Sequence, residues 1–89
     1  MKSTKGNLKK LEELMNSVGY VVRYEKGSFK SGYCILENKQ VAVINRYFET
    51  EARINSLLDI LSLIQIDETA LPDEQLQFWT KIKQTEFQS

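Results

Sequence analysis

Apolar residues recur every three or four positions in three stretches of the chain, which is the spacing of one face of an α-helix. The first stretch follows Asn7, a good helix N-cap, and ends at Gly19, which suits a left-handed helix end. The second follows the expected cap Thr50, and the third follows Pro72, a residue common at the first helical position. The helices are expected to pack through Leu8, Leu11, Leu14, Met15 and Val18, through Ile54, Leu57, Leu58, Leu61 and Ile64, and through Leu76, Trp79 and Ile82.

Between the first two helical stretches, runs of β-branched and aromatic residues at 20–24, 33–36 and 41–45 predict three strands. The connectors between them are short, whereas a parallel crossover needs about a dozen residues or more. We therefore predict an α+β fold: an N-terminal helix, a three-stranded antiparallel meander and two C-terminal helices on one sheet face, in the order αβββαα. Residues 1–6 are expected to form a flexible tail and residues 7–89 a single domain.

The lack of histidine narrows the candidate chemistry. Without an imidazole, Ser-His and Cys-His catalysis are excluded, and one cysteine cannot complete a usual zinc site. Cys34 lies in an apolar run with no histidine beside it, so we expect an inert core thiol. The sequence predicts no enzyme activity, no catalytic residue, no metal ligand and no cofactor.

The placement of the protein in the cell follows from the same composition. A single cysteine supports no disulfide framework, which favours a reducing compartment. The opening residues 1–6 lead into a charged amphipathic stretch and not into the apolar core of a signal peptide. The longest apolar stretch, 54–66, is interrupted by polar residues and is short for a membrane span. We expect a cytoplasmic protein without a membrane partner.

Charge is distributed unevenly although the total is zero. Residues 1–46 hold nine basic and four acidic groups, a net charge of +5, and residues 47–89 hold three basic and eight acidic groups, a net charge of −5. The two halves could attract one another within the fold or form solvated faces without specific meaning. They could also steer self-association or the approach of a charged partner.

A basic and aromatic cluster falls on the first two predicted strands and the turn between them. Aromatic rings stack on bases and basic groups hold phosphates, so this mixture is a candidate surface for single-stranded nucleic acid. The alternative is that the tyrosines lie at the edge of the core and the lysines keep the turn soluble. The candidate binding residues are Tyr20, Arg23, Tyr24, Lys26, Phe29, Lys30 and Tyr33.

A second polar cluster occurs where the third strand leads into the central helix. Its members, Asn45, Arg46, Arg53 and Asp59, could meet in a polar cleft. Asp59 lies next to the apolar face of the helix, so we expect it to be partly buried and paired with an arginine. Such a pair is more often structural than catalytic, although a raised carboxyl pKa would favour a functional site.

One stretch of the chain resembles a known family. The run 41–45, followed by Glu51-Ala52-Arg53-Ile54, is similar to the start of the zinc metallopeptidase domains of the ImmA/IrrE type. In that resemblance the family's His-Glu-x-x-His motif falls on Leu58-Asp59-Ile60-Leu61-Ser62, where both histidines are absent. The resemblance therefore implies a degenerate, non-catalytic relative, with leucine in place of the metal. The phrases Tyr24-Glu25-Lys26-Gly27 and Ser31-Gly32-Tyr33-Cys34 also resemble those of small uncharacterised bacterial proteins.

Taken together, these patterns favour a small non-enzymatic module that acts through protein contacts. Short strands leave sheet edges, and an exposed edge combined with opposed charges favours pairing with another chain. The expected partner is another protein or a second copy, as in a homodimer. The alternative is single-stranded nucleic-acid binding through the basic, aromatic hairpin.

Overall fold

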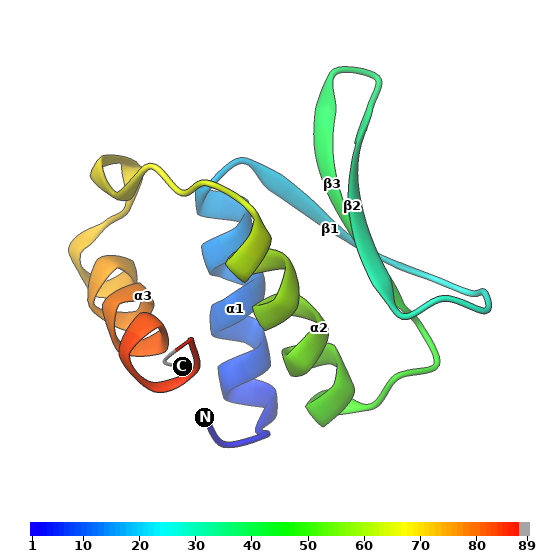
Figure 1. Ribbon diagram of the computed structural model, residues 1–89, viewed down its shortest axis with the longest axis horizontal. Coiled ribbons are helices and arrows are strands. Elements are labelled where there is room, and N and C mark those ends of the chain that lie inside the picture. Colours follow the sequence, from blue (N-terminus) through cyan, green and yellow to red (C-terminus); the bar gives the residue numbers. More distant parts are fainter. Residues whose placement is uncertain (88–89) are drawn as a thin grey trace.

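The structure, a computed structural model, describes residues 1–87. Three helices, one short 3-10 turn and three strands follow one another along this part of the chain (Figure 1). They are α1 (Lys5–Ser17), β1 (Tyr20–Glu25), β2 (Ser31–Leu36), β3 (Lys39–Asn45), α2 (Thr50–Leu63), η1 (Glu68–Ala70) and α3 (Asp73–Thr85). The predicted α+β class and the order of the helices and strands are confirmed.

Helix α1 begins earlier than its sequence pattern indicates. Its N-cap is Thr4 and not Asn7, because the Thr4 hydroxyl accepts a hydrogen bond of 3.1 Å from the Asn7 backbone N–H. Lys5 and Gly6, which we assigned to the tail, therefore lie in the first helical turn. Gly19 follows the helix with φ of +93°, so it ends the helix as predicted.

The sheet is mixed, and the prediction of an antiparallel meander is wrong. The strand order is β1-β3-β2, with β1 parallel to β3 and β2 antiparallel to it. Strand β3 is central and is the most buried of the three strands, with Val41, Ala42 and Ile44 all buried. The chain from β1 to β3 includes residues 26–38, which meets the length that a parallel crossover needs. Strand β2 lies within that crossover.

The molecule has three layers: the sheet, then α1 and α2, then α3 (Figure 1). Helix α1 packs against β1 and against α2, which lies over β3 and β2. Helix α3 lies on the far side of α1 and α2 from the sheet, so the prediction that both C-terminal helices pack on the sheet is wrong for α3 (Figure 1). One core joins the layers, and it includes Leu57, Leu71, Trp79 and Ile82.

Trp79 is 6% exposed and packs in the core as predicted. Its indole N–H donates to the Glu68 carboxylate at 3.1 Å, and the Lys83 ammonium donates to the same oxygen at 2.6 Å. The Lys83 Nζ also lies over the Trp79 ring, 5.6 Å from its centre. Hydrogen bonds from Lys83 and then from Trp79 lower the pKa of the Glu68 carboxyl. These contacts connect η1 to α3.

Acidification is expected to change the fluorescence of Trp79. Because the pKa of Glu68 is lowered in the folded protein, the contacts of its carboxylate are complete above the ordinary value of 4.5 and are lost as pH falls through the folded pKa. The emission of this single tryptophan should therefore titrate with a midpoint below 4.5. In Glu68→Gln this step should disappear, while Glu74→Gln, also in the outer layer, should retain it. A midpoint above 4.5 in the wild type would contradict the assignment.

Candidate functional site

The structure separates the aromatic and basic members of the first candidate cluster. The rings of Tyr20 and Tyr24 lie on the face of β1 that α1 covers, whereas Arg23 alternates to the opposite, exposed face. Lys26 and Lys30 are exposed in the connection after β1. Phe29, in the same connection, is partly buried. The seven residues therefore do not form one continuous surface of rings and cations.

Of the three tyrosines in this cluster, Tyr33 is the one whose ring is well exposed. It lies on β2 with 47% of its surface accessible, and its ring meets the buried Tyr20 edge-on, with 6.3 Å between the ring centres. Burial raises the pKa of the Tyr20 hydroxyl, and the neighbouring Tyr33 raises it further. This pair links β1 and β2 across the central strand.

Tyr24 takes part in a polar contact between three structural elements. Its hydroxyl donates to the Glu12 carboxylate of α1, and the Arg53 guanidinium of α2 lies over its ring at 4.5 Å from the centre. Burial, and then the hydrogen bond to Glu12, raises the pKa of the Tyr24 hydroxyl. The Tyr24 hydroxyl is therefore a neutral donor that helps to hold α1, β1 and α2 together.

Asn45 is a buried structural residue at the end of β3, with 7% of its surface exposed. Its side-chain Nδ2 donates to the carbonyl oxygens of Gly27 at 3.0 Å and Phe29 at 2.6 Å. Its Oδ1 accepts from the backbone N–H of Tyr47 at 2.9 Å. The amide therefore fixes the connection between β1 and β2 and the turn that follows β3.

The predicted polar cleft is not formed. The Arg53 side chain donates to the backbone carbonyls of Phe48 at 2.8 Å and Arg46 at 3.1 Å, so it fixes the turn that leads into α2. The Arg46 side chain is exposed. Asp59 is also exposed, and none of the ion pairs within residues 1–87 includes it, so the prediction of a partly buried aspartate paired with arginine is wrong. Asp59 lies six residues, or about 1.7 turns, beyond Arg53 and therefore on another side of α2, since 3.6 residues make one turn.

The most exposed apolar side chains of the sheet lie on β2. Ile35 is 73% exposed, Leu36 is 48% exposed, and Cys34 is exposed as well. The expectation of a core thiol at Cys34 is therefore wrong: β2 is an edge strand and lies beside the core, not within it. The strand 31–36 contains no charged residue and no proline. Natural edge strands usually carry such residues to prevent pairing with other chains.

The backbone groups of β2 that point away from the sheet can be identified from one hydrogen bond. The Asn45 N–H donates to the carbonyl of Lys30 at 3.3 Å, so Lys30 faces β3. Orientation alternates along an antiparallel strand, and Cys34 therefore also faces β3. The N–H and C=O groups of Tyr33 and Ile35 point to the free edge. These two residues thus combine free backbone groups with exposed side chains.

A tight turn sets the geometry of this edge. Glu37 and Asn38 have φ of 52° and 66°, the pattern of a two-residue type I′ turn, whose twist matches that of the flanking strands. The turn pairs Leu36 with Lys39 and so determines which side chains of β2 lie on each face. Figure 1 shows the tip of this hairpin projecting beyond the helices. Neighbouring elements therefore leave the end of β2 accessible.

Within residues 1–87, a single ion pair joins the two oppositely charged halves of the chain. Arg23 pairs with Glu25 at 3.0 Å within β1, and Lys83 pairs with Glu68 within the C-terminal half. Only the Met1 amine, 2.9 Å from Glu86, joins the halves among the ion pairs of residues 1–87. Most of the charge that distinguishes the halves is therefore free to act on other molecules.

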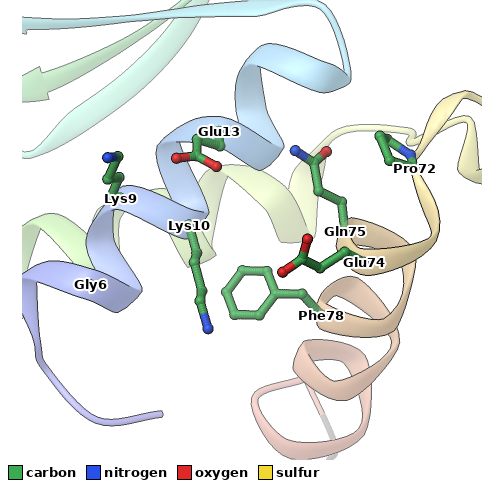
Figure 2. Close-up of a pocket in the computed structure, with 8 residues that line it drawn as sticks. All are labelled: Gly6, Lys9, Lys10, Glu13, Pro72, Glu74, Gln75 and Phe78. Carbon is green, nitrogen blue, oxygen red and sulfur yellow. The ribbon is translucent and has the colours of Figure 1, made fainter.

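A groove between α1 and α3 was not anticipated from the sequence. Figure 2 shows Lys9, Lys10 and Glu13 of α1 on one side and Gln75 and Phe78 of α3 on the other. The groove has a volume of about 510 Å³, and the Lys10 Nζ lies 5.8 Å from the centre of the Phe78 ring. The Gln75 Oε1 atom is buried without a hydrogen-bond partner in the structure. The groove contains both acidic and basic groups and therefore favours no one ligand charge.

The sequence does not identify Ile35 and Leu36 as surface residues, because a meander places their strand in the middle of the sheet. No local signal separates this strand from the third one, since residues 33–36 and residues 41–44 are both unbroken apolar runs. The lack of charge in residues 31–36 indicates an interaction surface only once β2 is known to be an edge strand.

Two further findings concern the part of the chain that the structure describes. None of its helices is both long and apolar enough to cross a membrane. Within it, no three histidine, cysteine, aspartate or glutamate side chains gather where they could hold a metal ion. Comparisons of this chain with protein-family models, with curated proteins and with solved structures gave no match.

Proposed function

We propose that this protein is a non-enzymatic interaction module that binds a strand of another polypeptide chain along the free edge of β2. The observation that carries the proposal is the combination, at Tyr33 and Ile35, of exposed apolar side chains with backbone groups that point away from the sheet. In strand addition, main-chain hydrogen bonds provide affinity and alternate side chains provide specificity. Strand β2 offers both.

The other edge of the sheet is less suited to this role. Strand β1 carries Arg23 and Glu25 on its exposed face, paired with one another at 3.0 Å. Its opposite face is covered by α1. Charged side chains at an edge oppose pairing with a further strand, whereas β2 has none between residues 31 and 36. This contrast supports β2 as the binding edge.

The non-enzymatic part of the proposal is supported by how the polar candidates are used. Asn45 and the guanidinium of Arg53 make their hydrogen bonds to backbone groups, and Tyr24 donates to Glu12. Groups committed to such contacts are structural and are not arranged around an open space where a substrate would react. The nucleic-acid alternative is not favoured by any specific observation, since the rings of Tyr20 and Tyr24 face α1 and not the solvent.

A library of short displayed peptides tests the proposal. Peptides selected on the wild-type protein should lose binding to Ile35→Pro, because proline removes the N–H that points to the free edge. The variant should keep its fold, since Ile35 does not donate to β3 and is 73% exposed. Lys81→Ala, an exposed change on α3, is the matched control and should bind every selected peptide like the wild type.

Circular dichroism would verify that both variants keep their fold. Selected peptides that bind Ile35→Pro as well as the wild type would refute the β2 edge as the binding site, as would a selection that enriches none. Filter binding with single-stranded RNA at low salt addresses the alternative. Retention of RNA that is lost in Lys30→Glu would support the basic, aromatic hairpin instead.

A further inference from the structure

We propose that the partner of the β2 edge is a second copy of this chain, related to the first by a two-fold axis that passes beside Cys34. This inference rests on the proposed function, because it uses the same edge. The two β2 strands would run antiparallel and join the two sheets into one sheet of six strands. Closed two-fold dimers of this kind present the same surface on both copies.

The two-fold axis limits the registers that are allowed. In a continuous sheet, residues opposite one another must lie on the same face. For two identical antiparallel strands, this requires the axis to pass beside a residue and not between two residues. Within β2, a centre at Tyr33 pairs residues 31–35, a centre at Cys34 pairs residues 32–36, and a centre at Ile35 pairs only residues 34–36.

Among these three registers, the one centred at Cys34 matches the exposed side chains best. It places Tyr33 opposite Ile35 of the other copy twice, so that an aromatic ring meets a β-branched side chain in each pair. Centring at Tyr33 would instead place Ile35 opposite Ser31. Centring at Ile35 would place Tyr33 opposite Glu37, whose φ of 52° takes it out of the ladder.

The backbone hydrogen bonds fit the same register. Tyr33 and Ile35 of the other copy would exchange both of their N–H to C=O bonds, because the groups of both residues point to the free edge. The two Cys34 residues would then form a non-hydrogen-bonded pair, in which the Cα atoms lie about 4.5 Å apart. That separation lies within the range of a disulfide, which is about 4.4 to 6.8 Å.

Charge does not oppose pairing with a second copy along the strand. Lys30 precedes β2 and Glu37 follows it, with no charge between them. In the register centred at Cys34, the paired residues 32–36 are therefore all uncharged. The net charge of the chain is zero, so two copies do not repel one another through their overall charge.

Oxidative cross-linking tests the central pair. Diamide takes up two electrons and two protons as two thiols become a disulfide, and it supplies the oxidant. The control is Cys34→Ser with Leu63→Cys, which moves the single thiol to a residue of α2 that is 68% exposed. At micromolar protein, the wild type should form covalent dimers roughly 100-fold faster than the control, because pairing raises the effective concentration of the thiols to the millimolar range.

A mixture of two variants tests the register itself. In the proposed pairing, Gly32 lies opposite Leu36 of the other copy, also as a non-hydrogen-bonded pair. Gly32→Cys and Leu36→Cys, each made with Cys34→Ser, should form disulfide-linked heterodimers when mixed. Each variant alone should form covalent dimers no faster than the Leu63→Cys control. Circular dichroism of each variant before mixing confirms that both are folded.

Sedimentation equilibrium under reducing conditions separates the inference from the proposed function. A concentration-dependent dimer with rapid Cys34 cross-linking and mixed heterodimers supports the inference. A dimer without these cross-links overturns the register. A monomer at all concentrations overturns the second copy as partner, while peptides that still require Ile35 would leave the proposed function intact.

Discussion

Leu57→Ala is expected to lower the free energy of unfolding by about 2–5 kcal/mol, the range for leucine truncation in a closely packed core. Leu57 has no exposed surface and lies on α2, between the sheet and the outer layer of the molecule. A chain of this size is expected to have a total stability of only about 4 to 13 kcal/mol. The variant should therefore unfold at a much lower urea concentration than the wild type.

The matched control for Leu57→Ala is Leu63→Ala, the same change on the same helix. Leu63 is 68% exposed, so its truncation should change the free energy of unfolding by no more than about 0.5 kcal/mol. Urea unfolding followed by circular dichroism measures both variants, with the slope of the transition checked for constancy. Equal losses in the two variants would mean that α2 does not occupy the centre of the core.

Asn45→Ala is expected to cost about 2–4 kcal/mol, because it removes three hydrogen bonds and leaves buried backbone groups without partners. Asn45→Asp separates the contributions of these bonds. Aspartate keeps an acceptor for the Tyr47 N–H but cannot donate to the carbonyls of Gly27 and Phe29 when it is ionised. The ionised carboxylate would face these two carbonyl oxygens. Asn45→Asp should therefore lower the free energy of unfolding at least as much as Asn45→Ala near neutral pH.

Asn55→Ala is the control for Asn45, since Asn55 is exposed on α2. Its effect on the free energy of unfolding should stay within about 0.5 kcal/mol. Urea midpoints again provide the comparison. An Asn45→Asp protein as stable as the wild type would show that the two carbonyls do not depend on the amide, and would leave Asn45 without its structural role.

The helices could be predicted from the sequence because their signal is local. Leu8, Leu11 and Leu14 repeat at helical spacing, and their burial follows from that period alone. The N-cap was misplaced because Thr4 and Asn7 are both good caps and lie within one turn of each other. Only the geometry of the first turn distinguishes the two.

The order of the strands could not be read from connector length, because a short connector limits how two consecutive strands can pair but does not require that they pair. In this sheet, β1 pairs with a strand that is not its neighbour in sequence. The side chains whose roles depend on this pairing were therefore misjudged, Cys34 among them. Likewise, the carbonyls to which the Asn45 side chain donates lie 16 and 18 residues away in the chain, so its structural role depends on long-range contacts.

The position of β3 between β1 and β2 also constrains the order of events during folding. The first two strands never pair with one another, so β1 has no partner until the last strand is in place. The β2 and β3 hairpin has a two-residue turn and can close alone, an event that takes about 1–10 μs. Pairing of Tyr20 with Gln40 must close a longer loop, so we expect β1 and the helix before it to join a hairpin that has already formed.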